Sequence, residues 1–262
     1  NNQYLGGDSV TNKGEPTVSA GATGLKSLAA GINATAKGMK SMAVGYNVSA
    51  IADGAIAVGS EAKTEGGNAI AVGYGATVLS SAELSVAIGD KATATGVRDI
   101  FIGNNAGFRD DPSLTNDSTI NHNIGIGSSA GKNSKSSNLI AIGTGAGEGN
   151  TGKNNVVIGA LASSASGAGA VSADFIIAIG ERSHASKNAA IAIGNRAFSK
   201  GVNAIAMGAG ALAEQDRTVA VGAVAHATGQ NSTAVGNGAI SDGVNAAAFG
   251  FGANATVDTA IA

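Results

Sequence analysis

The amino-acid sequence predicts an all-β protein, a two-layer parallel β-roll (a solenoid) built from 14-residue repeats. A short motif, aliphatic–Ala–aliphatic–Gly, recurs along most of the 262 residues. Within the motif, large and small side chains alternate with the period of two that is typical of a β-strand. The composition, with 41 glycines and only 13% charged residues, is not that of a coiled coil or a disordered chain.

The recurrence is regular enough to define coils. About 15 glycines end a copy of the motif, and nine of the 14 intervals between them are 14 residues long. A repeat of this length cannot bury its apolar residues alone, so successive copies are expected to stack about 4.8 Å apart. The clearest of these anchor glycines are Gly59, Gly73, Gly89, Gly194, Gly208 and Gly222.

Each repeat is expected to hold two short strands and two turns. The first strand is the motif itself, as in Ile70-Ala71-Val72, and the anchor glycine permits a tight turn after it. A second strand follows with small residues on one side, as in Val224-Ala225-His226-Ala227-Thr228-Gly229. A second glycine often closes the coil.

The first strand is apolar on both faces, so both faces need a cover. We expect the bulky Ile and Val side chains to fill the roll, opposite the alanines of the second strand. The alanine between them then faces outward, and a stripe of exposed alanine would be covered by further copies of the chain. The alanines expected at this interface are Ala57, Ala71, Ala192, Ala206 and Ala220.

Two insertions interrupt the head domain expected over 25–262, which follows a cap or lead-in over 1–24. The insertions lie at 104–122 and 163–174. Loops that project from a rigid scaffold tend to carry function. The first contains Phe and Arg, residue types that are enriched at binding hot spots. The candidate ligand-binding residues are Phe108, Arg109, Asp110 and Asp111.

Several classes of function are not favoured. The net charge of -2 gives no reason to expect a nucleic-acid partner, and the chain has no cysteine to bind a metal or act as a nucleophile. Gly127-Ser128-Ser129-Ala130-Gly131 matches a nucleophile pattern but lacks the strand-to-helix setting that this pattern requires. We expect no catalytic residue, no metal and no cofactor. No segment is apolar enough to span a membrane as a helix.

The phrase Asn68-Ala69-Ile70-Ala71-Val72-Gly73 and its 14-residue recurrence resemble the head repeats of YadA-like trimeric autotransporter adhesins of Gram-negative bacteria. The resemblance covers roughly residues 25–262. It implies a left-handed roll, a homotrimer and display on the bacterial cell surface, with anchoring in the outer membrane through a C-terminal region absent from this sequence. It also implies binding to host matrix proteins such as fibronectin, laminin or collagen, or to a cell-surface receptor.

The chain departs from the collagen-binding version of the repeat, Asn-Ser-Val-Ala-Ile-Gly-x-x-Ser. The final Ser is Ala in most copies, as at Ala76, Ala146 and Ala211, and only Ser183 matches. A variant repeat, Ile-Gly-x-x-Ala-Gly, occupies the middle of the chain. Besides a surface adhesin, the sequence leaves open a self-association or biofilm module, a structural spacer and, less favoured, a solenoid enzyme.

Overall fold

The structure is a computed structural model that describes residues 10–11, 21–110, 121–163 and 172–262. Within these residues the chain forms short β-strands and no helix, and the strands pair in parallel from one coil to the next. The predicted all-β class and parallel β-solenoid are therefore confirmed. The chain divides into two compact units, unit 1 (1–133) and unit 2 (134–262).

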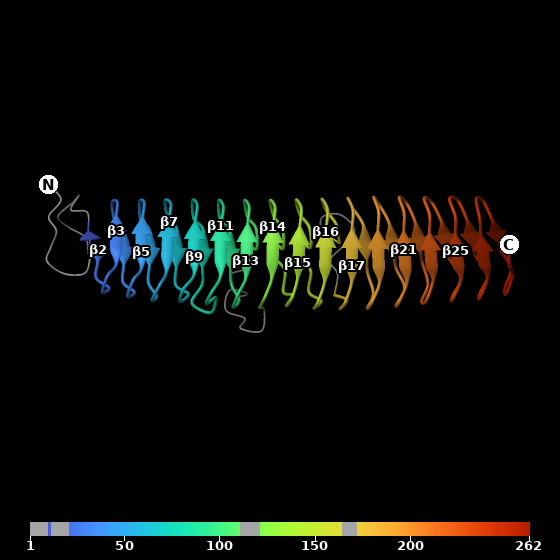
Figure 1. Ribbon diagram of the computed structural model, residues 1–262, viewed down its shortest axis with the longest axis horizontal. Helices are drawn as coiled ribbons and strands as arrows, with labels where there is room; N and C mark the ends of the chain where they lie inside the picture. The colour runs from blue at the N-terminus through green and yellow to red at the C-terminus, as the bar shows by residue number, and fades with distance from the viewer. Residues whose placement is uncertain (1–9, 12–20, 111–120, 164–171) are drawn as a thin grey trace. The chain divides into compact units, whose positions relative to one another are not determined.

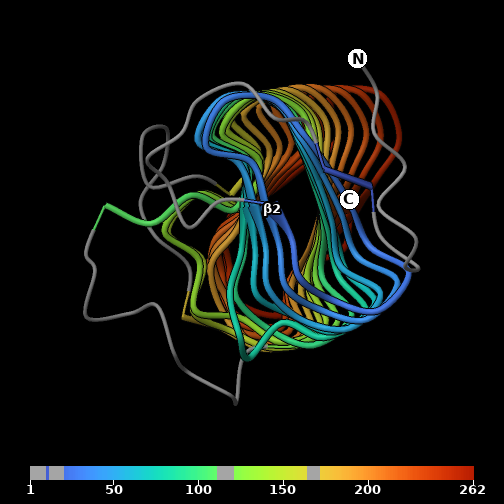
Figure 2. The ribbon, with the colours of Figure 1, turned by 90° about the vertical axis from the view of Figure 1, so that its left-hand side faces the viewer.

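In unit 1, each regular coil contributes its motif to a first sheet and a two-residue strand to a second sheet. Figure 1 shows the first strands side by side in chain order, and Figure 2 shows successive coils one behind another. The first strands are β1 (Val10–Thr11), β3 (Leu28–Ala30), β5 (Met42–Val44), β7 (Ile56–Val58), β9 (Ile70–Val72), β11 (Val86–Ile88), β13 (Ile100–Ile102) and β14 (Ile124–Ile126). The second strands are β2 (Gly21–Ala22), β4 (Thr35–Ala36), β6 (Ser49–Ala50), β8 (Lys63–Thr64), β10 (Thr77–Val78) and β12 (Thr93–Ala94).

Unit 2 repeats this plan. Its first strands are β15 (Ile140–Ile142), β16 (Val156–Ile158), β17 (Ile177–Ile179), β19 (Ile191–Ile193), β21 (Ile205–Met207), β23 (Val219–Val221), β25 (Thr233–Val235) and β27 (Ala247–Phe249). Its second strands are β18 (His184–Ala185), β20 (Phe198–Ser199), β22 (Leu212–Ala213), β24 (His226–Ala227), β26 (Ile240–Ser241) and β28 (Asn254–Ala255). Equivalent residues of neighbouring coils pair directly, as Ala206 does with Ala220.

The interior of each roll is lined by alanine, and this corrects the predicted orientation of the first strand. The alanine at the centre of the motif points inward, while the flanking Ile and Val point outward and are partly exposed. The prediction that these alanines face another chain is wrong, because their side chains are already enclosed by their own coil. All five alanines assigned to the interface, Ala57, Ala71, Ala192, Ala206 and Ala220, have no exposed surface within the single chain.

The physical reason is the small space between the two layers. Alanines directly before the second strands, such as Ala76 before β10 and Ala211 before β22, are equally buried and face the motif alanines across the roll. Small side chains on both sides let the two layers pack closely at high density. Side chains as large as Ile at the same positions would force the layers apart.

The anchor glycines occupy a position that no other residue could adopt without strain. Gly73 has φ +135°, and a Cβ added to it would lie 2.5 Å from the carbonyl oxygen of Gly89 in the next coil. Gly194 has φ +133° and would meet Gly208 in the same way. Both the backbone conformation and the close stacking of turns therefore require glycine.

Side chains at the turns also stack from coil to coil. The side-chain amide of Asn33 donates to Asn47 Oδ1 at 2.8 Å, and the backbone N–H of Val202 donates to Asp216 Oδ1 at 2.8 Å. Asn at a left-handed position, as at Asn33 and Asn47, fits a conformation that this residue tolerates better than most. The ladders satisfy polar groups that the strands leave unpaired.

The middle of the chain departs from the regular coil. In the described residues between β13 and β18, first strands form without a second strand. The variant repeat places Gly107, Gly131 and Gly147 in the left-handed region, with φ values of 63°, 62° and 62°. The chain turns there, at the position where the second strand of a regular coil would begin.

Candidate functional site

The outward side chains of the first strands form an apolar surface in each unit, which we call the aliphatic face. In unit 1 it includes Ile56, Val58, Ile70 and Val72, whose β7 and β9 partners are in direct register. Larger members are substantially exposed, for example Ile88 at 37% and Met207 at 40%. Contiguous exposed aliphatic surface of this kind marks an interaction site.

The first insertion begins on the roll and does not present Arg109 as an exposed hot spot. Phe108 is half-buried, and Arg109 retains only 8% exposure. Asp110 is exposed, accepts a hydrogen bond from Asn133 Nδ2 at 2.8 Å and pairs with Lys132 Nζ at 3.2 Å. Those contacts hold the pKa of Asp110 below its usual value, the bond from Asn133 contributing most. Asp111 lies outside the described residues.

Arg109 contributes to the electrostatic environment of a buried carboxylate, Asp99. Asp99 Oδ2 accepts from the backbone N–H of Gly96 at 2.8 Å, and Oδ1 accepts from that of Asn123 at 2.9 Å. Burial raises the pKa of Asp99 from 3.8 to about 6, although the N–H donors of Asn123 and Gly96 and the charge of Arg109 act in the opposite direction. The sequence analysis did not identify Asp99.

The second insertion is tied to the roll at both ends that the structure describes. The backbone N–H of Ser163 donates to the carbonyl of Ser183 at 2.8 Å. At the other end, Asp174 Oδ1 accepts from the backbone N–H of Lys153 at 2.7 Å, and the N–H of Asp174 donates to Asn188 Oδ1 at 3.1 Å. Both connections are internal to unit 2.

The position at which the collagen-binding repeat carries Ser is buried in this chain. Ala76, Ala146 and Ala211 have no exposed surface, and neither does Ser183. The hydroxyl of Ser183 donates to the carbonyl of Gly180, the anchor of its own coil, at 3.0 Å. The exchange of Ser for Ala therefore alters the interior of the roll rather than its surface.

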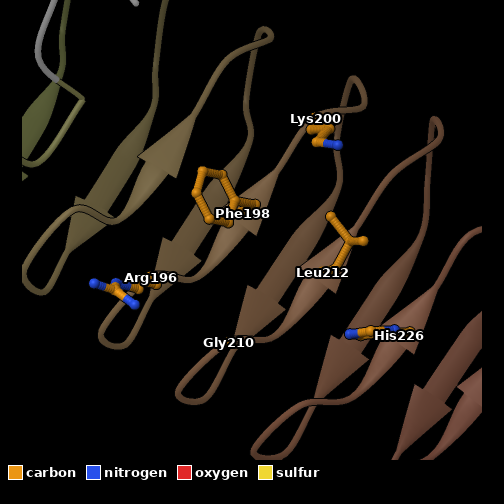
Figure 3. Close-up of a pocket in the computed structure, with 6 residues that line it drawn as sticks. All are labelled: Arg196, Phe198, Lys200, Gly210, Leu212 and His226. Atoms are coloured by element: carbon orange, nitrogen blue, oxygen red, sulfur yellow. The ribbon is translucent and has the colours of Figure 1, made fainter. Parts of the chain in front are cut away.

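A groove lies on the opposite layer, over the second strands of unit 2. Its volume is about 350 Å³, and Figure 3 shows the side chains that line it. Phe198, Leu212 and His226 are half-buried and stand on the same side of β20, β22 and β24, in direct register. The groove is lined by Arg196, Phe198, Lys200, Gly210, Leu212 and His226.

Cations lie near both ends of the groove. Arg196 precedes β20 and Lys200 follows it, and both side chains are exposed. Lys200 Nζ pairs with Glu214 Oε1 at 2.9 Å. Next to the groove, the ring of His184 packs 6.3 Å from that of Phe198, and burial, followed by the charge of Lys200, lowers the pKa of His184.

The segment Gly127-Ser128-Ser129-Ala130-Gly131, which matches a nucleophile pattern, is a turn of the repeat. Ser129 occupies the left-handed turn position after the anchor Gly127, with φ 56°, and its N–H donates to the carbonyl of Asn104 at 2.8 Å. Throughout the described ranges, no group of three or more His, Asp or Glu side chains lies close enough to hold a metal ion. The described residues also contain no helix that could cross a membrane.

Comparison with known proteins adds an independent observation. A family model for the YadA head domain repeat matches residues 22–47, 50–76, 80–106, 177–197, 199–225, 213–239 and 227–253, which is more than half of the chain. Among solved structures, the collagen-binding domain of the Yersinia adhesin YadA aligns with 23% identity and a TM-score of 0.39, covering 64% of this chain and 79% of that chain. No curated protein matches.

Proposed function

Because this chain belongs to the family of YadA head domain repeats, we propose that it is the binding head of a bacterial surface adhesin. It acts as a homotrimer on the outside of the cell, and it binds host matrix proteins or a cell-surface receptor. The observation that carries the proposal is the aliphatic face, an extended apolar surface on an otherwise regular and stably hydrogen-bonded roll.

The aliphatic face supports assembly through the first strands. Because the Ile and Val side chains of this face are partly buried in the single chain, covering each of them contributes only part of the about 1.5–3 kcal/mol gained on burying a fully exposed side chain. The side chains recur in every regular coil, so association buries many of them in one step. A closed ring of three chains covers each face with its neighbours and leaves the second-strand layer free for other partners.

The trimer is tested by multi-angle light scattering on the full chain. We expect a mass three times the chain mass of 25.0 kDa. Val72→Glu combined with Ile88→Glu places charges on the aliphatic face and should yield monomers. Thr77→Glu combined with Thr93→Glu places the same charges on the outward side of β10 and β12 and should leave the trimer intact.

A wild-type chain that is monomeric at every concentration tested would contradict the proposed assembly. Trimers that persist in the Val72→Glu, Ile88→Glu variant would also contradict it, because they would place the interface elsewhere. Circular dichroism on each variant separates loss of assembly from loss of folding.

A trimeric head binds a ligand more tightly than a single chain does, even when each individual site binds weakly. Three copies of one site can engage a large fibrous ligand together, and the second contact then forms at high effective concentration. Fibronectin, laminin and collagen are extended, repetitive ligands that suit this mode. The first insertion remains part of the proposal, with Phe108, Asp110 and Asp111 as its candidate contacts.

Solid-phase binding to a panel of the three matrix proteins tests the ligand class. The test variant removes the central part of the first insertion by replacing residues 111–120 with a Gly-Ser sequence of equal length. The contacts of Asp110 with Lys132 and Asn133 are retained in this variant. We expect saturable binding to at least one panel member, with reduced binding by the variant. If the chain binds only to itself, the adhesin is a self-association module instead.

A further inference from the structure

The outward side chains of the second strands differ in chemistry between the two units. In unit 1 the paired row is polar, consisting of Thr35, Ser49, Lys63, Thr77 and Thr93. In unit 2 the equivalent row runs from His184 to Asn254, and its members before Asn254, which we call the outer row, are His184, Phe198, Leu212, His226 and Ile240. His184 is buried and the side chains of Phe198, Leu212 and His226 are half-buried, so the outer row packs along the sheet and still leaves part of its surface exposed to a partner.

The groove exists because one side chain is missing. Gly210 lies between Arg196 and Val224 at the same turn position of three successive coils. The glycine leaves room above the row of Phe198, Leu212 and His226. Its φ of +66° is accessible to Asn, so glycine is not demanded here by the backbone alone.

The groove cannot accept a ligand as an added strand. The backbone groups of β20, β22 and β24 are engaged with neighbouring coils, for example Phe198 N with Ala211 O and Leu212 N with Ala225 O. Recognition must therefore come from side chains. The apolar side chains of Phe198 and Leu212 suit one aromatic or branched side chain of the ligand, and the hydrogen-bonding side chains of Arg196, Lys200 and His226 stand around them.

The charges around the groove select the rest of the ligand. Arg196 and Lys200 stand at opposite ends of β20, and Arg182 holds the equivalent position one coil away from Arg196. Glu214 pairs with Lys200, and Glu181 lies beside the Arg196 end, where its carbonyl accepts from the N–H of Arg196. The residues that line the groove include two cations, Arg196 and Lys200, and no carboxylate, which favours carboxylates in the partner.

We propose that this groove binds an acidic polypeptide segment of a partner protein, which inserts one apolar side chain over Gly210 and sets carboxylates against Arg196 and Lys200. The site faces away from the aliphatic face, so it stays accessible in the proposed trimer. The inference rests on the proposed binding role in naming a polypeptide as the ligand, and it assigns that role a site distinct from the insertion.

The test uses fluorescein-labelled peptides and the full chain, with fluorescence anisotropy as the readout. The probe peptide has the sequence Gly-Glu-Asp-Phe-Asp-Glu-Gly, acetylated and amidated at its ends. One control peptide replaces all four acidic residues with Lys, and a second replaces Phe with Gly. We expect measurable binding of the probe alone, weakening as salt concentration rises.

Matched variants locate the binding. Gly210→Asn fills the groove at a φ that Asn tolerates, and Phe198→Ser removes part of its floor; each should raise the Kd at least about tenfold. Gly238→Asn is the control, because Gly238 has the same φ of +66° two coils away and does not line the groove. That variant should leave the Kd within about twofold.

Several results would overturn the inference. They are an absence of binding by the probe, equal binding by the lysine peptide, or an equal effect of Gly210→Asn and Gly238→Asn. Displacement of the probe by a sulfated oligosaccharide at lower concentration than by unlabelled peptide would assign the groove to a glycan. Self-association that Gly210→Asn abolishes would assign it to a second copy. Each of these results leaves the light-scattering and matrix-binding tests unaffected.

Discussion

Asp99 replaces the small residue that usually precedes a first strand. The equivalent residue is Ser85 one coil earlier and Ser232 in unit 2, and both are buried. The carboxylate joins two coils, because it accepts from Gly96 in its own coil and from Asn123 in the coil that follows the insertion. Burying a charge is unfavourable, so this connection makes stability depend on pH.

We predict that Asp99 lowers the free energy of unfolding as pH rises. The carboxyl binds its proton more tightly in the folded chain, where its pKa is about 6, than in the unfolded chain, where it is 3.8. Asp99 therefore contributes its full stabilisation of the folded state below pH 3.8, and this contribution is lost as pH rises through about 6. The free energy of unfolding falls by about 3 kcal/mol over this range. Urea unfolding at pH 4 and pH 7 measures it.

The control is Asp99→Ser, which introduces the residue type found at the equivalent position of the preceding coil. This variant should lack the Asp99 contribution, so its loss of stability between pH 4 and pH 7 should be smaller than that of the wild type. Identical pH profiles for the two proteins would show that Asp99 titrates normally in the fold.

At the scale of the element, β13 shows how the roll accepts one large inward side chain. Phe101 takes the place of the usual alanine and is 4% exposed. Its direct partner in β14 is Gly125, where an added Cβ would overlap the ring. A Cβ at Gly107 would lie 2.6 Å from Phe101 Cγ. Two glycines therefore provide the space that one phenylalanine fills.

A double-mutant cycle tests this exchange of volume. Gly125→Ala should destabilise by about 1–3 kcal/mol through overpacking. Phe101→Ala should destabilise by about 3–5 kcal/mol through a cavity. The double variant restores the alanine pair of a regular coil, so its loss should be smaller than the sum. Chemical denaturation measures all three, and additive losses would show that the two positions do not share space.

The repeat and its strands could be predicted from the sequence, but the orientation of the first strand could not be predicted correctly. Alternation determines which residues share a face and leaves open which face is inside. Side-chain size alone predicts that Ile and Val lie inside. The decisive quantity was the separation of the layers, which depends on the side chains of the whole coil. The buried alanines directly before the second strands, such as Ala76, already indicate a narrow space in most coils.

The candidate site was predicted only in part. Arg109 was chosen for its residue type, but its burial makes it a partner of Asp99, which a pattern of residue types does not reveal. The constant positions of the repeat do not indicate the groove, because the side chains that line it occupy variable positions. Phe198, Leu212 and His226 recur at 14-residue intervals, and this row of two apolar side chains and one histidine is visible in the sequence once variable positions are compared by coil.

At the scale of the whole molecule, the fold is a chain of nearest-neighbour interactions. Each regular coil pairs with the coil before it and the coil after it, through strands and through turn ladders. Stability in such an array is approximately a sum over coils and the contacts between neighbours. The exact number of regular coils is therefore less important than the register between them.

Deletion of one complete coil tests this property. Removing residues 209–222 joins Gly208 to Ala223 and keeps every position of the repeat in register. We expect a folded protein with an unchanged circular dichroism signal per residue. Removing residues 209–215 deletes half a coil and should disrupt the strands of unit 2, because it brings unlike positions together. Equal stability of the two deletions would contradict a register-dependent fold.

The pairing of each strand with a neighbour so near in sequence also bears on how the chain reaches its native state. Parallel strands usually require the closure of long loops, yet Ile56 pairs with Ile70, and even across the first insertion Ile100 pairs with Ile124. The entropy lost on closing such loops is small and nearly constant. A polypeptide emerging end first from a ribosome or a pore can therefore lock each turn as soon as the next has cleared the exit, without waiting for the rest.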